Sequence, residues 1–454
     1  MAALALLVLG LLLGPATTAG ASVVGCNPEA DASAALTDTA DGAGRPITRD
    51  PGYPKPPTPK VLLPQDDGSA ALDGSPMAVY FSPSASGSTK WTISIDGGGW
   101  CDDEVDCLCR SKGSLGSSTK QPAENWCLCS NVNDSGDGYE KDCNCLRLPY
   151  LDGASFSGYR EKPWPVPNST ETLHFRGIRN FDAAVNFALS KGMTKATDFV
   201  LSGGSAGGLS TFLHADRVAA RLKAEAPACK KIRAAPIVGY FLDHDNFKHT
   251  TGLPGGPNSP QWAKPGTGAT YTTWMRYVYH MQNMTFGADG GLTKACQAKF
   301  PTEPGLCFMS PHMQEFIETP FFMFNSKYDA WQLGNIFQSD WQTKEEQAGV
   351  LQYGKDFMKQ LAPVYLPASG GSKAGDGRGS RGKNGGMITS CICHGCPWSD
   401  LVVEGKNTFE HYFDWSMGRT EGGAPSMHID TRHPNGGGAL NGTTFQMCRH
   451  FPYD

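Results

Sequence analysis

Short apolar runs separated by helical patterns dominate the chain. Six runs of apolar, β-branched or aromatic residues have the length of buried strands: 77–81, 91–95, 199–201, 237–242, 321–324 and 387–392. Before the third run, Phe181, Val185 and Leu189 recur every four residues, and a second helical pattern begins near Leu209. Strands that alternate with helices predict an α/β fold with a mostly parallel sheet and helices on both faces.

The first 21 residues are predicted to be a cleaved secretory signal peptide. Residues 2–13 are apolar, and the small residues Ala19, Gly20 and Ala21 suit signal peptidase. This run is much shorter than the roughly 20 apolar residues of a membrane-spanning helix. We therefore expect a secreted, extracellular protein with no stable membrane insertion.

The rest of the chain is predicted to form one large domain, 77–454, preceded by a Pro-rich arm at 22–76. Residues 368–386 are Gly, Ser and basic residues with no apolar side chain able to pack, so we expect a flexible surface loop. A basic patch for an anionic polysaccharide is the alternative for this loop. The formal net charge of -5 argues against a nucleic-acid partner.

Cysteine usage also favours an oxidising compartment. Seven of the 15 cysteines lie between Cys101 and Cys145, in a mainly polar segment that predicts a disulfide-rich insertion at 101–145. Zinc binding is less favoured there, because its Cys-x-Cys pairs are tighter than the usual ligand spacing. Since 15 is odd, at least one cysteine stays free or pairs between chains.

Four Asn-x-Ser/Thr sequences are possible acceptors for N-linked glycans in a secreted protein. A glycosylated asparagine lies on the surface, so we expect each of them to be exposed. They are Asn133, Asn168, Asn283 and Asn441.

The strongest chemical motif is Gly-x-Ser-x-Gly, formed by Gly203, Ser205 and Gly207. It follows a predicted strand and precedes a predicted helix, which is the context of the nucleophile elbow in serine hydrolases. The flanking glycines permit a strained turn that presents the serine hydroxyl at the sheet edge. We therefore predict that Ser205 is a nucleophile.

A glycine tract supplies candidate donors for an oxyanion hole. Residues 95–100 read Ile-Asp-Gly-Gly-Gly-Trp directly after a predicted strand, a pattern typical of the HGGG-type esterase loop. The amide of Gly98 or Gly99, together with that of Ala206, would stabilise the oxyanion. A simple tight turn is the alternative for three glycines alone.

The acid and the base should follow the nucleophile in that order. Asp329 follows the predicted strand at 321–324, and His394 follows the one at 387–392, so both lie at carboxyl ends of strands. The spacing leaves other candidates open. They are Asp243 and Asp245 for the acid, and His411, His428 and His433 for the base.

The motifs together resemble the pectin acetylesterase/Notum family. The matching segments, in order, are Asp-Gly-Gly-Gly-Trp-Cys101, Gly-Gly-Ser-Ala-Gly-Gly208, Ser-Lys-Tyr-Asp-Ala-Trp-Gln332 and Ser-Cys-Ile-Cys-His394. The resemblance covers roughly residues 77–394. It implies an α/β-hydrolase-like fold, the triad Ser205, His394 and Asp329, and an oxyanion hole at Gly98 and Ala206. Family members usually have Glu at the position of Asp96.

The resemblance implies a secreted serine esterase that hydrolyses O-acetyl esters on extracellular or cell-wall polysaccharide, without a metal or cofactor. A Notum-like carboxylesterase that removes a fatty acyl group from a protein or lipid is the alternative within enzymes. A catalytically inactive binding protein on the same scaffold is the alternative outside enzymes. The sequence does not indicate an oligomeric state.

Overall fold

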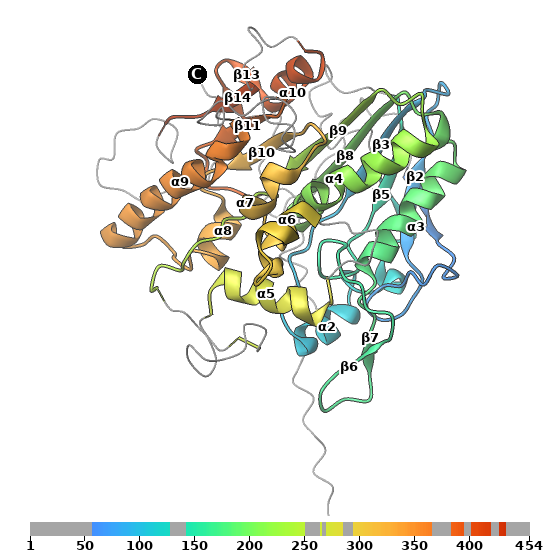
Figure 1. Ribbon diagram of the computed structural model, residues 1–454, viewed down its shortest axis with the longest axis horizontal. Helices are drawn as coiled ribbons and strands as arrows, with labels where there is room; N and C mark the ends of the chain where they lie inside the picture. Colours follow the sequence, from blue (N-terminus) through green and yellow to red (C-terminus); the bar gives the residue numbers. More distant parts are fainter. Residues whose placement is uncertain are drawn as a thin grey trace, which may run out of the picture.

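A computed structural model describes residues 57–127, 142–249, 264–265, 269–284, 294–365, 383–394, 401–418 and 426–432. These residues contain a sheet of ten strands in the order β14-β11-β10-β9-β8-β3-β5-β2-β1-β4 (Figure 1). The strands are β1 Thr58–Leu62, β2 Ala78–Ser82, β3 Lys90–Ile95, β4 Glu124–Asn125, β5 Asn144–Leu148, β8 Asp198–Gly204, β9 Lys231–Ile237, β10 Phe322–Ser326, β11 Gly385–Thr389 and β14 Ser426–Ile429.

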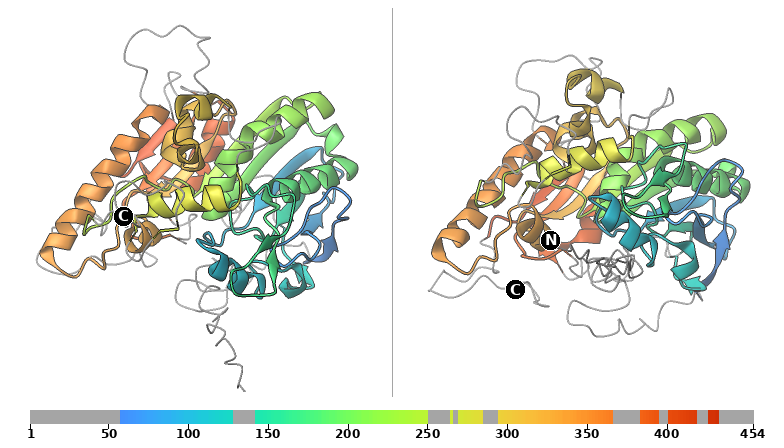
Figure 2. Two further views of the ribbon diagram at one scale, coloured as in Figure 1. Left: turned by 60° about the horizontal axis from the view of Figure 1, so that its bottom comes forward. Right: turned by 90° about the horizontal axis from the view of Figure 1, so that it is seen from below.

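The sheet is mostly parallel, as predicted. Every neighbouring pair from β14 to β5 is parallel, whereas β2, β1 and β4 add an antiparallel edge. The chain crosses the sheet from this edge to β14, so blue and green segments lie on one side of the molecule and orange and red segments on the other (Figure 2). The carboxyl ends of the parallel strands therefore meet at one edge, where ligands bind in open α/β sheets.

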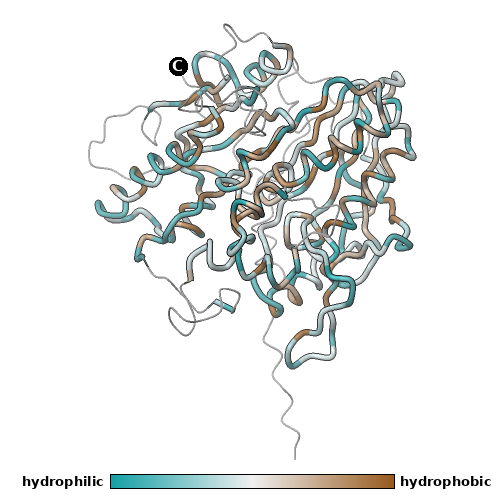
Figure 3. Tube along the Cα trace, viewed as in Figure 1, coloured by the Kyte–Doolittle hydropathy of each residue, from teal (hydrophilic) through white to brown (hydrophobic). Residues whose placement is uncertain are grey.

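Helices cover both faces of the sheet. Met323 of β10 belongs to the same core cluster as residues of α3, α4 and α9. Phe322 and Phe324 belong to a second cluster, in which both contact Tyr412 of α10. Apolar residues accordingly concentrate on the strands and the inner sides of the helices (Figure 3). The helices are α2 Glu104–Ser111, α3 Gly177–Ser190, α4 Ala206–Glu225, α5 Tyr271–Met281, α6 Lys294–Lys299, α7 Ser310–Met313, α8 Ala330–Asn335, α9 Lys344–Tyr365 and α10 Thr408–Ser416.

Shorter elements complete the described residues. Two small hairpins pair β6 with β7 and β12 with β13. The bounds are β6 Trp164–Pro165, β7 Thr172–Leu173, β12 Val402–Val403 and β13 Lys406–Asn407, and the 3-10 turns are Ser118–Lys120, Met193–Lys195, Pro304–Phe308 and Gln314–Phe316. No helix of the described residues is long and apolar enough to cross a membrane.

One predicted strand is wrong. Of the apolar run at 237–242, only Ile237 is in a strand, because β9 begins at Lys231 and ends at Ile237; residues 238–242 are a buried loop. The amide of Tyr240 donates to the side chain of Asn325, and the amide of Leu242 donates to Gln332, both at 3.1 Å. Side chains thus replace the strand partner that these buried amides would otherwise need.

Three predicted boundaries also shift. The expected arm at 22–76 supplies β1, whose residues 60–62 pair with β2, so the described part of the arm belongs to the domain. The cysteine-rich insertion at 101–145 runs into β5, a strand between β3 and β2. Gly385, near the end of the expected loop at 368–386, begins β11 and is buried. Residues 1–56, Asn133, Asn441, His433 and 366–382 lie outside the described residues.

Disulfides tie the loops near the predicted glycine tract. The described pairs are Cys101–Cys107, Cys127–Cys145 and Cys296–Cys307. Disulfide bonds also involve Cys109, Cys143, Cys391 and Cys393. Cys229, by contrast, is a buried free thiol, and burial raises its pKa to about 11. The cysteine-rich segment is therefore cross-linked, as its composition predicted.

Candidate active site

Ser205 lies in a strained turn between β8 and α4. Its φ of 57° and ψ of -125° place it in a region that a non-glycine residue rarely occupies. The Ser205 amide donates to Ile237 O at 2.9 Å, which fixes the turn against β9. A Cβ at Gly203 would lie 2.4 Å from Gly207 O, so the motif needs glycine there. This is the strand-turn-helix geometry of a nucleophile elbow.

The structure brings Ser205, His394 and Asp329 together. His394 Nε2 lies 2.9 Å from Ser205 Oγ, and His394 Nδ1 lies 2.8 Å from Asp329 Oδ2. Asp329 is fully buried, and the side chain of His394 is only 11% exposed. A carboxylate on one imidazole nitrogen and a hydroxyl on the other form the hydrogen-bonded chain that activates a serine.

The sheet positions Asp329 and His394 as neighbours. Asp329 follows β10 and His394 follows β11, and these two strands pair in parallel, with Ser326 opposite Thr389. Asp329 also caps α8, because its Oδ1 accepts the Gln332 amide at 3.0 Å. One carboxylate oxygen is thus fixed by the helix, and the other is left for the imidazole.

The competing acids have other environments. Asp243 Oδ2 lies 2.6 Å from His312 Nε2, and the same carboxylate accepts from the Thr272 hydroxyl. Burial raises the Asp243 pKa, but the hydrogen bonds from His312 and Thr272 and the charges of His312 and Arg276 together lower it. Asp245 has a side chain that is 72% exposed. The carboxylate that contacts His394 is therefore that of Asp329.

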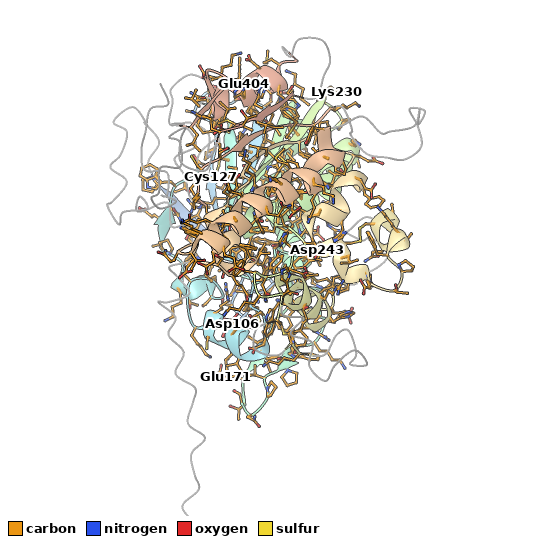
Figure 4. The ribbon with its side chains drawn as sticks, turned by 90° about the vertical axis from the view of Figure 1, so that its left-hand side faces the viewer. Asp106, Cys127, Glu171, Lys230, Asp243 and Glu404 are labelled. Atoms are coloured by element: carbon orange, nitrogen blue, oxygen red, sulfur yellow. A yellow bond between two sulfur atoms is a disulfide. The ribbon has the colours of Figure 1, made fainter. Side chains whose placement is uncertain are left out.

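Two of the competing bases, His411 and His428, lie in a separate cluster. His411 Nε2 lies 2.7 Å from Val403 O, and its ring stacks on that of His428, with centroids 3.6 Å apart. His428 in turn contacts Glu404 at 2.7 Å. Figure 4 shows Glu404 at the opposite end of the molecule from Asp106 of α2, the helix that follows the glycine tract. These histidines are therefore remote from the tract.

The glycine tract packs against the elbow. A Cβ on Gly97 would lie 2.5 Å from Gly204 O and 2.8 Å from Ser205 Cβ, so only glycine permits this approach. Gly98 and Gly99 follow as buried residues. Asp96 forms an ion pair with Arg147 of β5 at 2.9 Å, which holds the start of the tract.

The amides proposed for the oxyanion hole flank this contact. Ala206 is the first residue of α4, and first-turn amides have no partner within their helix. Gly98 O accepts from Arg110 Nη1 at 2.5 Å, and Gly99 has a φ of +66°. Sequence reasoning missed Arg110, because a basic residue within a cysteine-rich segment has no diagnostic spacing.

The cysteine-rich side of the tract is acidic. Asp102 follows the tract directly, and its pKa is raised to about 6 by burial and by the charges of Asp106 and Asp103. The Arg110 guanidinium opposes this rise. Among the described residues, no group of three or more His, Cys, Asp and Glu side chains could hold a metal ion.

Two of the predicted glycan acceptors are in the described residues. Asn168 is exposed, in the turn between β6 and β7. Asn283 is half-buried, and its Nδ2 donates to Tyr159 O at 3.1 Å. Asn168 thus has the exposure expected of an acceptor, whereas the nitrogen of Asn283 that would carry a glycan is engaged within the protein.

Comparison with known proteins assigns the family. The Pectinacetylesterase family model matches residues 57–255 and 265–436, which is most of the chain. The chain belongs to the pectinacetylesterase family. As a member of this family, it is a carboxylic ester hydrolase, and its substrates are esters.

Individual relatives of this pectinacetylesterase support the same assignment. Pectin acetylesterase 11 of Arabidopsis thaliana is 28% identical, over 72% of this chain and 76% of its own. Pectin acetylesterase 5 of the same plant is 29% identical, over 82% and 81%. The palmitoleoyl-protein carboxylesterase NOTUM of Homo sapiens is 26% identical, but over only 39% and 35%.

A solved structure is similar in fold. The Wnt deacylase Notum from Drosophila superposes with a TM-score of 0.64 at 19% identity, covering 84% of this chain and 98% of its own. The chain therefore has the α/β-hydrolase-like fold that the sequence predicted, with a large mostly parallel sheet flanked by helices.

Proposed function

We propose that this protein is a secreted serine esterase that removes O-acetyl groups from extracellular or cell-wall polysaccharide. One observation supports the proposal above all others: His394 lies within hydrogen-bond distance of both Ser205 and Asp329, in a chain of the pectinacetylesterase family. The disulfides support export, since such bonds persist in oxidising compartments. The predicted signal peptide is consistent with the same location.

The proposed mechanism follows from the contacts. His394 Nε2 removes the Ser205 proton, and the serine oxygen attacks the ester carbonyl. Asp329 holds the imidazole in the required tautomer and stabilises the imidazolium. Backbone amides from the glycine tract and Ala206 stabilise the tetrahedral oxyanion, and His394 then protonates the leaving alcohol. Water, activated by the same histidine, releases acetate from the acyl-enzyme.

The extent of the matches favours acetyl over fatty acyl substrates. Two pectin acetylesterases are 28% and 29% identical over 72% and 82% of this chain. The NOTUM proteins of Homo sapiens and Drosophila melanogaster are 26% and 23% identical over 39% and 65%. The likeness to the solved Drosophila structure is at 19% identity and supports the fold alone. A fatty-acyl substrate is therefore the second candidate, and an inactive scaffold the third.

The test uses purified full-length protein, a fluorophosphonate probe, acetylated pectin and a palmitoleoylated peptide. We expect covalent labelling and release of acetate from pectin, both abolished in Ser205→Ala. Ser202→Ala is the matched control, because Ser202 lies on β8, three residues before Ser205, and its hydroxyl donates to Ala235 O and not to the histidine. Acetate release by Ser205→Ala would refute the serine mechanism. Deacylation of the peptide without acetate release would refute the proposed substrate.

A further inference from the structure

Four aromatic rings from distant parts of the chain form one cluster, the aromatic tetrad. Trp100 ends the glycine tract, Phe241 lies in the loop after β9, Tyr271 begins α5 and Trp331 lies in α8. All six pairs of rings are in contact, with centroids between 4.9 and 6.4 Å apart. Trp100, Phe241 and Tyr271 are each at least nine-tenths buried.

The aromatic tetrad adjoins the base of the proposed triad. The His394 ring lies 6.3 Å from that of Phe241 and 6.2 Å from that of Trp331. Trp331 follows the acid Asp329 by two residues in sequence. Figure 1 shows α5 between α8 and α2. The rings therefore border the space in which a bound ester reacts.

Hydrogen bonds link the aromatic tetrad to the nucleophile elbow. Trp100 Nε1 donates to Ser155 Oγ at 2.8 Å, and the Ser155 hydroxyl donates to Ala206 O at 2.8 Å. The Ser155 amide bonds the Tyr150 hydroxyl, also at 2.8 Å. Because Ala206 follows the nucleophile, the Trp100 indole is held in a fixed relation to Ser205.

Rings in mutual contact leave no passage for a hydrocarbon chain between them, since aromatic pairs at these separations are close-packed. An acyl group on Ser205 must extend from a carbon held near His394 and the oxyanion amides. A chain directed toward the aromatic tetrad would meet Phe241 or Trp331 within a few carbon atoms. A fatty acyl chain that took this direction would have to displace these rings.

The hydroxyl group of Tyr271 supports the same conclusion. The Tyr271 hydroxyl is buried and has no hydrogen-bond partner in the described part of the chain. A buried hydroxyl left unpaired is unfavourable, and hydrocarbon packed over it could not satisfy it. A small ligand with hydroxyl or carbonyl oxygens nearby could.

We infer that the aromatic tetrad is the wall of the acyl site and restricts the enzyme to esters of short acyl groups, of acetyl size. This inference rests on the proposed function and adds the residues that determine its acyl specificity. Each methylene that a site cannot accommodate lowers kcat/KM by about 10-fold or more. Butyrate has two methylenes more than acetate, so we expect p-nitrophenyl butyrate to react about 100-fold more slowly than the acetate, and the octanoate to be nearly inert.

The test compares kcat/KM for p-nitrophenyl acetate, butyrate and octanoate. Phe241→Leu and Trp331→Leu should each raise the octanoate-to-acetate ratio by about 10-fold or more. Phe322→Leu is the matched control, because Phe322 is as buried as Phe241 but packs on the opposite face of the sheet, against α10. It should leave the ratio unchanged.

The outcomes separate the two proposals. Equal rates of the wild type on acetate and octanoate, abolished in Ser205→Ala, would overturn the acyl wall and leave the serine mechanism intact. A ratio unchanged in both Phe241→Leu and Trp331→Leu would also overturn the wall, provided that fluorophosphonate labelling shows folded enzyme. If either variant fails to fold, Trp331→Phe, which keeps a smaller ring, replaces it and should raise butyrate hydrolysis selectively.

Discussion

Replacing Arg110 should weaken catalysis through the backbone of the glycine tract. Arg110 is 8% exposed, donates from Nη1 to Gly98 O at 2.5 Å and lies 3.5 Å from Asp106. Gly98 C=O and Gly99 N–H belong to one planar peptide group, so the guanidinium fixes the direction of both. Loss of this bond frees the peptide to rotate and misdirects an amide proposed to stabilise the oxyanion.

The magnitude follows from two contributions. A hydrogen bond to a charged donor contributes about 1.5 to 3 kcal/mol, so Arg110→Met should lower the free energy of unfolding by about 2 kcal/mol. Deleting one oxyanion donor lowers kcat by about 10² to 10³. Since the Gly99 amide is retained but misdirected, we expect kcat to decrease by about 10²-fold, near the lower limit of that range. Arg110→Lys should recover part of it, because lysine keeps the charge but lacks the planar fork.

The assay separates the effect of Arg110 on the direction of the Gly99 amide from its effect on packing. A trifluoromethyl ketone forms an anionic tetrahedral adduct with the serine, so its affinity should fall in parallel with kcat, while KM for p-nitrophenyl acetate changes little. Arg217→Met is the control, because it removes a half-buried ion pair between Arg217 and Asp182 of α3, away from the tract. Unchanged kcat and inhibitor affinity in Arg110→Met, with a stability loss like that of the control, would show that Arg110 is structural only.

Three further predictions concern the acid, a buried carboxyl and the disulfides. Asp329→Asn should lower kcat by about 10³ to 10⁴ without unfolding, whereas Asp243→Asn should cost less than 10-fold; the reverse order, measured by steady-state kinetics, would contradict the assignment. Burial raises the pKa of Asp152 from 3.8 to about 7. The folded protein therefore binds this proton more tightly than the unfolded chain, so urea denaturation should show stability falling as pH rises from about 4 to about 7, and Asp152→Asn should flatten that slope. Reduction of Cys101–Cys107 should decrease the esterase rate before far-UV circular dichroism changes, since this disulfide closes the segment after the glycine tract; full activity with reduced thiols would argue against that role.

Local sequence patterns predicted the parts of the fold that depend on neighbouring residues. The elbow is recognisable because the strand, the strained turn and the helix are contiguous around Ser205. The apolar run at 237–242 was predicted to be a strand, but its residues are apolar because they are buried in a loop. Its amides are satisfied by Asn325 and Gln332, which lie more than 80 residues away, so no local signal marks it as a loop.

Long-range contacts account for what the sequence did not reveal. β5 lies within a cysteine-rich, mainly polar segment, and only its two neighbours in the sheet, β3 and β2, make it a strand. The aromatic tetrad draws on four segments between Trp100 and Trp331, each of which is an ordinary aromatic position in isolation. Residues whose role depends on such distant partners have no characteristic spacing.

The choice between the two candidate acids shows why strand order matters. Asp243 and Asp329 both follow apolar runs, so the sequence treats them alike. In the sheet, β10 pairs directly with β11, and the loops that leave these strands carry Asp329 and His394 to adjacent positions. Asp243 follows β9, one strand further from β11, and meets His312 instead. The acid nearest the base in space is thus the one whose strand is nearest in the sheet, which no spacing along the chain encodes.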